Sequence, residues 1–190
     1  MSAAITNLSM DCALYPEDFA ISKDRLIDYW IAEGFIEEVK NTQAKYDRGH
    51  IILNRLVNCC LLESAKYGRC VKMHDLIRDT VLWITSESRL FMVKSGVGLL
   101  EFPGEQAEWK ENLEKVSLIG NFFEQIPSNM SPHCKILSTL WLLVADDLMR
   151  ITECFFVHMH GLKVLNLSSS NIEVLPNSVS DLTNLRLLLL

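Results

Sequence analysis

Residues 71–84 read Val-Lys-Met-His-Asp-Leu-Ile-Arg-Asp-Thr-Val-Leu-Trp-Ile, and the first half of the chain is organised around this stretch. Apolar residues recur in it three and four positions apart, the spacing that places side chains on one face of a helix. The expected apolar face consists of Ile77, Val81 and Ile84, with Met73, Leu76 and Thr80 beside them. The stretch therefore predicts an amphipathic helix, which begins at the pair His74 and Asp75.

His74 and Asp75 stand at the expected N-terminus of this helix, where free N–H groups and the positive end of the helix dipole favour anions. The dipole also discourages protonation of a histidine, so we expect a neutral imidazole that can donate one hydrogen bond. Such a group suits a phosphate neighbour. The alternative is a His-Asp pair that caps the helix and binds no ligand, and the local pattern leaves both interpretations open.

Three blocks of sequence carry a family resemblance. They are Cys-Ala-Leu-Tyr-Pro-Glu-Asp-Phe at residues 12–19, Leu-Ile-Asp-Tyr-Trp-Ile-Ala-Glu-Gly-Phe-Ile at residues 26–36, and Met-His-Asp at residues 73–75. In this order the blocks resemble the winged-helix subdomain of the plant nucleotide-binding leucine-rich-repeat (NB-LRR) disease resistance proteins. Residues 93–99 and 116–119 resemble the connector and the first repeat of the coiled-coil branch of that family. The resemblance covers the chain from about Leu8 onward, which is a middle slice of the family's architecture.

The resemblance implies a nucleotide-dependent role for one residue. In the complete family member, the histidine of the Met-His-Asp motif touches the ADP phosphate and helps to hold the resting state, which exchange for ATP releases. Carried over to this sequence, that contact falls on His74, and Asp75 positions the loop. The chain contains no G-x-x-x-x-G-K-[ST] phosphate-binding loop. ADP or ATP is therefore expected in the full-length family, and no nucleotide is expected to bind this chain alone.

The first half of the chain predicts a winged-helix plan of helix, helix, hairpin and final helix. Ser22 is the expected N-cap of the first helix, and Gly34 is its expected C-terminal stop. Beyond it we expect a polar connector at residues 37–48, either a solvated loop or a fraying helix end. A second helix is expected at residues 49–64, and a hairpin made of residues 61–66 and 70–73 around Tyr67-Gly68-Arg69. The sequence assigns residues 1–88 to this subdomain and predicts that it is truncated at its N-terminus.

From residue 113 onward the chain repeats itself. The matching triplets are Leu113, Val116 and Leu118; Leu137, Leu140 and Leu142; Leu162, Leu165 and Leu167; and Leu185, Leu188 and Leu190, at steps of 24, 25 and 23 residues. This period is typical of leucine-rich repeats, whose Leu-x-Leu cores form parallel strands. The predicted fold class is thus α+β with two domains, a helical winged-helix unit followed by a short leucine-rich-repeat solenoid. Residues 89–112 are expected to form a connector, and residues 113–190 an incomplete solenoid without a C-terminal cap.

Composition indicates a soluble protein of a reducing compartment. The chain has 190 residues, a formal net charge of −6 and six cysteines without a C-x-x-C pair. We interpret the cysteines as small buried hydrophobes, and no apolar run reaches the roughly 20 residues of a membrane helix. Cys154, His158 and His160 lack the paired spacing of zinc ligands, so no metal site is expected. The expected location is the cytoplasm, with no membrane span.

No catalytic constellation is present, which predicts a protein that is not an enzyme. We interpret the chain as a fragment of an intracellular plant immune receptor that acts in the defense response, with repeats that bind proteins. The expected partners are the missing nucleotide-binding domain and a pathogen effector or a guarded host protein. Trp141 and Asn166 are candidate partner-binding residues, because they fall on the predicted concave side in line with Ser117 and Leu189.

Two alternatives remain open. Winged helices often bind DNA, but the predicted helix at residues 49–64 offers mainly Asn54, Arg55 and Asn58 for phosphate and base contacts. These few polar groups argue against DNA binding, and so does the negative net charge, which disfavours contact with a polyanion. Nucleic acid is therefore not the expected partner. A DNA-binding winged helix with a repeat arm is nevertheless the first alternative, and a truncated product without an independent role is the second.

Overall fold

The chain forms two compact units. A computed structural model describes residues 8–36, 41–88, 90–142 and 148–190, and the units are Met1–Ile84 and Thr85–Leu190. The expectations for residues 1–7 and for residues 37–40 fall outside the described residues. The first unit combines helices with a small antiparallel sheet and the second consists of parallel strands, so the predicted α+β architecture of two parts is confirmed.

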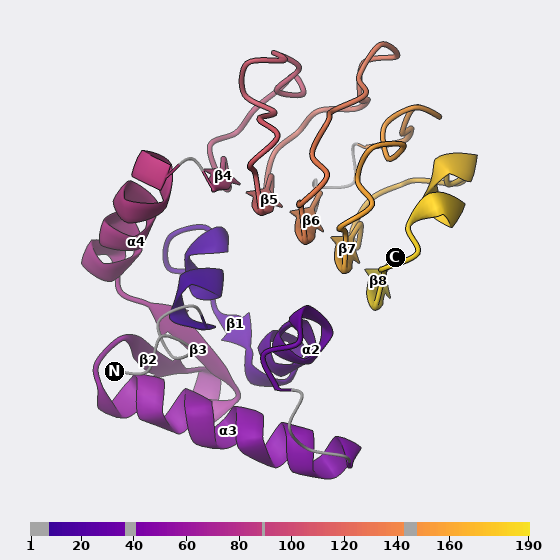
Figure 1. Ribbon diagram of the computed structural model, residues 1–190. Helices are drawn as coiled ribbons and strands as arrows, with labels where there is room; N and C mark the ends of the chain where they lie inside the picture. The colour runs from indigo at the N-terminus through magenta and orange to yellow at the C-terminus, as the bar shows by residue number, and fades with distance from the viewer. Residues whose placement is uncertain (1–7, 37–40, 89, 143–147) are drawn as a thin grey trace. The chain divides into compact units, whose positions relative to one another are not determined.

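The first unit has the elements of a winged helix (Figure 1). In chain order they are a 3₁₀ helix at Asp11–Leu14, β1 at Ile21–Ser22, α2 at Lys23–Glu33, α3 at Thr42–Asn58, β2 at Leu62–Ala65, a 3₁₀ turn at Lys66–Gly68, β3 at Cys70–Met73, and α4, which begins at Asp75 and ends at Ser88. The three strands form one antiparallel sheet in the order β1-β3-β2. The predicted hairpin is therefore present as β2 and β3, with β1 added at its edge.

The helix α2 begins and ends where the sequence predicts. Ser22 is its N-cap residue, and Gly34 is its C-cap residue with a left-handed φ of 92°. The Gly34 N–H donates to the carbonyl oxygens of Trp30 and Ile31, so backbone groups at the helix end are satisfied. A side chain at Gly34 would strain this left-handed turn, which explains the stop.

The helix α3 begins and ends earlier than residues 49–64, so this prediction was wrong at both ends. Its polar first turns, expected to be a loop, are capped by Asn41, whose Oδ1 accepts from the Gln43 N–H at 2.9 Å. Gln43 then donates to Asp47 at 3.0 Å, a spacing of one helical turn. Apolar periodicity does not reveal these turns, because most of their residues are polar. The helix stops at Asn58, and Cys60 adopts a left-handed φ of 57°.

The predicted helix at the Met-His-Asp motif is present as α4, but its buried face differs from the expected one. Leu76 and Ile84 are 73% and 45% exposed, whereas Arg78, Val81 and Thr85 are buried. These three residues follow the spacing i, i+3, i+7 of a single helix face. The apolar pattern therefore identified the helix but not its orientation, because Arg78 forms a polar contact that hydrophobicity alone does not predict.

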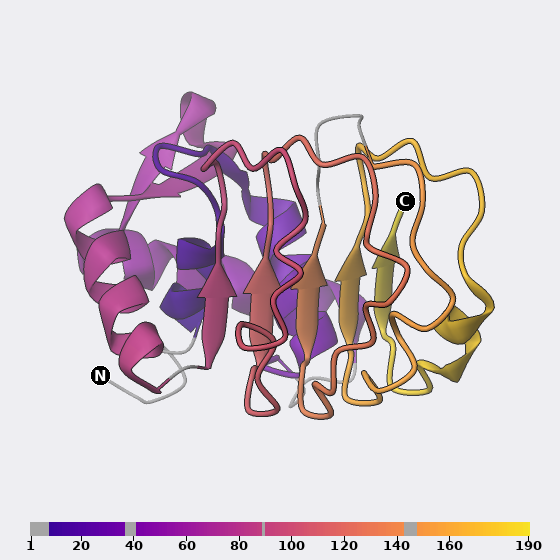
Figure 2. The same ribbon diagram turned by 90° about the horizontal axis from the view of Figure 1, so that it is seen from above.

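The second unit is a parallel-strand solenoid, as predicted. Its strands are β4 at Phe91–Val93, β5 at Lys115–Ser117, β6 at Thr139–Trp141, β7 at Val164–Asn166 and β8 at Leu187–Leu189. Each strand pairs in parallel with the next one, and Figure 2 shows the five strands side by side. The central residues Val116, Leu140 and Leu165 are fully buried in one apolar core. The repeat period thus corresponds to one strand and its return loop.

The strand β4 lies inside residues 89–112, the expected connector. It pairs with β5 through Met92 and Val116, which are separated by the same repeat step as the later strands. One repeat step before Leu113, Val116 and Leu118 the sequence has Arg89, Met92 and Lys94, so the flanking leucines that reveal the later strands are missing. The solenoid sheet consequently begins before residue 113.

Candidate functional site

The candidate site is the corner where β3 ends at Met73 and α4 begins at Asp75. His74 occupies the corner, and its side chain is exposed. The Leu76 N–H donates to His74 Nδ1 at 3.3 Å, so the imidazole caps the first turn of the helix. The His74 carbonyl oxygen accepts from Ile77 N–H at 2.9 Å and from Arg78 N–H at 3.0 Å. Side chain and backbone of His74 together satisfy the start of α4.

This geometry fixes the chemical role that His74 can take. Because Nδ1 accepts a hydrogen bond, the neutral ring carries its proton on Nε2. Within the described part of the chain, no group accepts a hydrogen bond from that Nε2–H. One outward N–H donor at a helix N-terminus fits a phosphate oxygen. The neighbouring Asp75 is also exposed, and its carboxylate complements the helix dipole in the first turn.

Arg78, one turn after His74, links the first turn of α4 to Tyr15 and was not identified from the sequence. Its Nε donates to the Tyr15 carbonyl oxygen at 2.8 Å, and the side chain is buried. A guanidinium is buried at low cost only where it has hydrogen-bond acceptors. The detectable signal was a basic residue at i+4 from His74 on a helix with apolar neighbours.

Lys72, two residues before His74, joins the corner to the turn that follows Pro16. Its Nζ donates to Asp18 Oδ1 at 3.0 Å and lies 3.6 Å from a Glu63 carboxylate oxygen. The hydrogen bond to Asp18 is the largest cause that raises the pKa of Lys72, and the charge of Glu63 adds to it. Lys72 is therefore committed to two carboxylates and is not a spare cation for a phosphate.

The candidate partner-binding residues lie next to each other in the solenoid sheet. Trp141 of β6 is in register with Asn166 of β7, as expected, and Ser117 and Leu189 continue the same row. Trp141 is 1% exposed and Asn166 is 2% exposed. The Asn166 Oδ1 accepts from Ser168, from the backbone N–H at 3.0 Å and from the hydroxyl at 2.6 Å. Their role in partner binding stays a prediction.

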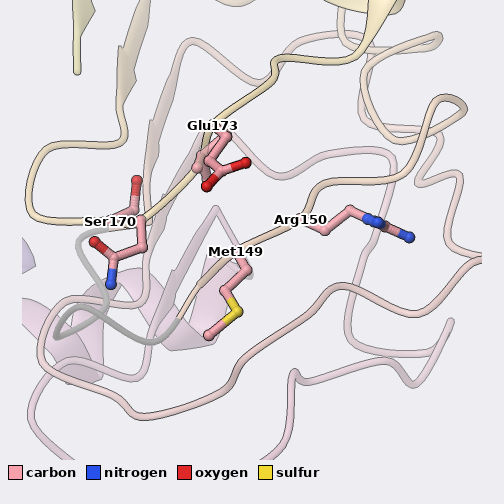
Figure 3. Close-up of a pocket in the computed structure, with 6 residues that line it drawn as sticks. Met149, Arg150, Ser170 and Glu173 are labelled. Carbon is pink, nitrogen blue, oxygen red and sulfur yellow. The ribbon is translucent and has the colours of Figure 1, made fainter.

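The solenoid also carries an open pocket of about 670 Å³ between the loops after β6 and β7. Figure 3 shows Met149 and Arg150 from one loop and Ser170 and Glu173 from the next, with the Arg150 guanidinium extending away from the other labelled side chains. The lining contains no sequence-predicted site residue. Its mixed, solvent-open character does not define a ligand class.

Of the residues proposed and rejected as zinc ligands, His158 stacks on another histidine. Its ring lies 3.9 Å from the His133 ring, centroid to centroid. Burial is the first cause that lowers the pKa of His158, followed by the nearby charges of His133, His160 and Lys135. In the described ranges, no group of three or more His, Cys, Asp or Glu side chains is arranged to hold a metal ion.

The cysteines are only partly the buried hydrophobes that the sequence suggests. Cys12, Cys70 and Cys134 are buried, but Cys59 and Cys60 are exposed. The prediction was wrong for this pair because α3 ends at Asn58, and both cysteines lie in the turn that precedes β2, while Leu56 and Leu62 on either side are buried. No helix of the described segments is long and apolar enough to cross a membrane.

Comparison with known proteins gives a consistent result for both units. Residues 14–81 match the family model described as the disease resistance protein winged helix domain. The chain is 41% identical over 183 residues to Disease resistance protein SUMM2 of Arabidopsis thaliana, an alignment that covers 93% of this chain and 20% of that protein. It is 39% identical over 181 residues to Disease resistance protein RPS5 of the same plant, covering 92% of this chain and 20% of the relative.

The alignments extend beyond the winged-helix region into the repeats, because they cover nearly the whole chain. The chain spans about a fifth of the length of these relatives. The winged-helix match, the solenoid and the identity of about 40% all lead to one conclusion: this chain belongs to the plant disease resistance proteins.

Proposed function

We propose that this chain is the winged-helix switch segment and the first leucine-rich repeats of an intracellular plant immune receptor of the NB-LRR type, located in the cytoplasm. In this role it regulates activation and does not catalyse a reaction. The main support is the His74 corner, an exposed imidazole at the start of α4 whose Nε2 is directed away from the capping interaction at Nδ1. The match to the disease resistance protein winged helix domain and the similarity to relatives named as disease resistance proteins support a role in plant immunity.

In the proposed role, His74 donates from Nε2 to a phosphate oxygen of ADP held by a separate nucleotide-binding domain. The α4 dipole favours an anion at this end of the helix. Bound nucleotide supplies the phosphate charge, whose change between ADP and ATP is the signal. Asp75 does not contact phosphate in this scheme, since two anions would repel each other; it keeps the first turn of α4 in place.

The repeats are proposed to bind proteins, namely the nucleotide-binding domain and a pathogen effector or guarded host protein. The row that contains Trp141 and Asn166 is the candidate contact. Because both side chains are nearly inaccessible, a partner reaches them only after their surroundings move. Asn166→Ala and Trp141→Ala each also destabilise the fold, because Asn166 Oδ1 accepts two hydrogen bonds and a buried ring is lost at Trp141. Partner binding is therefore compared only among variants that remain folded.

Nucleotide retention tests the His74 role. In a full-length chimera, this chain replaces the matching segment of Disease resistance protein SUMM2, a relative with 41% identity, and bound ADP is quantified after purification and acid extraction. His74→Ala is expected to lower the ADP content, because the donor is lost. His50→Ala, which removes another exposed histidine of the same unit, is the matched control. Equal ADP content in both variants would contradict the role of His74.

A further inference from the structure

A series of contacts joins residues 15–22 to residues 70–78 in reverse order along the chain, and at one end the two segments pair as antiparallel strands. In order along the chain, the joined pairs are Ser22 with Cys70 and Ile21 with Val71 in the strand ladder, Asp18 with Lys72, and Tyr15 with Arg78. His74 lies between the last two contacts in sequence. The corner is therefore attached on both sides to one continuous stretch of chain.

The first attachment is the ion pair between Lys72 and Asp18. Its N–O distance is 3.0 Å, and the two side chains are 35% and 73% exposed. Solvent screens such a pair, so it contributes little to the free energy of unfolding. It can still restrict the position of the end of β3. Its position matters because Lys72 is the second residue before His74 in the chain.

The second attachment is stronger, because it is buried. Arg78 Nε reaches the Tyr15 carbonyl oxygen at 2.8 Å from a side chain that is 8% exposed. Hydrogen bonds from a charged donor are roughly twice as strong as those between neutral groups. The Arg78 N–H also donates to the His74 carbonyl oxygen at 3.0 Å. The same residue thus contacts both the corner and the Tyr15 backbone.

The turn at the other side of these contacts is internally braced. The rings of Tyr15 and Phe19 stack with centroids 5.1 Å apart, and the Phe19 N–H donates to the Pro16 carbonyl oxygen at 3.3 Å. Asp18 sits between them with a left-handed φ of 53°. A non-glycine residue in this conformation is uncommon and is kept by its surroundings. The turn therefore provides a stiff point of attachment.

We infer that the braced turn of residues 15–19 is a positioning element for His74. Through Lys72 and Arg78 it fixes the two ends of the β3–α4 corner, and it thereby sets the direction of the Nε2–H donor. The helix N-terminus alone fixes only Nδ1, through the Leu76 N–H. This inference rests on the proposed function of His74, and it assigns to Lys72, Asp18 and Arg78 positioning roles without contact to a ligand.

Hydrogen exchange of the Leu76 and Ile77 amides in the full 190-residue chain tests the positioning directly, because both amides are bonded to His74. Arg78→Lys keeps the charge but loses the planar donor, and it is expected to speed exchange about tenfold, the factor for one lost charged hydrogen bond. Lys72→Met and Asp18→Asn each remove the exposed pair and are expected to speed exchange about two- to fivefold.

A double variant and a matched control sharpen this measurement. Lys72→Met with Asp18→Asn is expected to exchange no faster than Lys72→Met alone, because that single variant already lacks the ion pair with Asp18 as well as the one with Glu63. The control Lys94→Met breaks the ion pair with Glu108 in the solenoid, at 2.6 Å, and is expected to leave both amides unchanged. If Arg78→Lys unfolds, the Lys72 and Asp18 variants still decide the matter. Unchanged exchange in every folded variant would overturn the inference.

Nucleotide retention in the chimera then separates this inference from the proposed function. The attachment variants are Arg78→Lys, Lys72→Met and Asp18→Asn. If these variants and His74→Ala all lower ADP content, the positioning role of the turn and the nucleotide role of His74 both stand. If the variants speed exchange at the corner but neither they nor His74→Ala lower ADP content, the positioning stands and the nucleotide role fails. If His74→Ala lowers ADP content while the attachment variants, with faster exchange, retain it fully, the turn does not position the donor and the inference is overturned.

Discussion

The Tyr46 hydroxyl on α3 donates a hydrogen bond to the Asp28 carboxylate on α2. This bond joins α2 to α3 in the winged-helix unit and favours the neutral phenol. The pKa of Tyr46 is raised from 10.0 to about 12. The hydrogen bond to Asp28 is the largest cause, and burial and the charges of Asp28 and Asp24 follow.

The raised pKa of Tyr46 predicts a specific alkaline loss of stability. Below pH 10 the phenol is neutral in both states; between pH 10 and about 12 it ionises only in the unfolded chain, so the free energy of unfolding falls as pH rises through this window. Tyr46→Phe and Asp28→Asn are each expected to flatten this fall in urea denaturation at a series of pH values. A slope identical to that of the parent chain would show that the bond does not form.

Asn121 is expected to be one of the most sensitive polar residues of the solenoid. It is fully buried, and its Nδ2 donates to the carbonyl oxygens of Lys94 at 2.8 Å and Leu118 at 2.9 Å. Its Oδ1 accepts from the Leu99 N–H at 2.9 Å. Asn121→Ala leaves these backbone groups without partners, and we expect a loss of about 3 kcal/mol in the free energy of unfolding.

Asn184 provides the control for this prediction. It donates to the His160 carbonyl oxygen at 2.7 Å from an exposed position, where water can replace it. Asn184→Ala is expected to cost about 1 kcal/mol or less in the same chemical denaturation experiment. Equal losses for the two variants would mean that the Asn121 hydrogen bonds contribute no more than exposed ones.

Thiol reactivity is expected to divide the six cysteines. Cys59 and Cys60 are exposed, whereas burial, reinforced by the charge of Asp11, raises the pKa of the Cys12 thiol far above its usual range. Burial and the charge of Glu111 raise the pKa of Cys134 to about 11. At pH 8, alkylation followed by peptide mass analysis should label Cys59 and Cys60 first. Rapid labelling of Cys12 in the folded chain would contradict the fold around the Asp11–Leu14 helix.

The parts that the sequence predicts well have a strong period or a specific end signal. The leucine steps located four of the solenoid strands, whose central residues are Val116, Leu140, Leu165 and Leu188, and Gly34 located the end of α2. The strand β4 was not recognised, because the positions that correspond to Leu113 and Leu118 are occupied by Arg89 and Lys94. The leucine pattern therefore predicted the solenoid architecture but not every strand of its sheet.

The candidate corner shows the same limit for polar contacts. The sequence placed His74 at the start of a helix, and the exposed ring and its bond to Leu76 agree with that placement. The attachments through Lys72 and Arg78 join residues 54 and 63 positions apart in the chain. Local patterns contain no information about pairs at such separations, because only the folded backbone brings them together.

The central claim is that His74 acts through Nε2 and is more than a helix cap, and His74→Asn in the full-length chimera tests it most directly. The asparagine Oδ1 can take the place of Nδ1 as the cap of α4, but its side chain ends before the position of Nε2. The measurement is the dissociation rate of bound ADP, with unfolding of the same variant as the control for the cap. The account predicts unchanged stability and at least about tenfold faster release, the factor for one lost hydrogen bond to a charged group. Release at the parent rate would mean that His74 only caps the helix, and it would contradict the account.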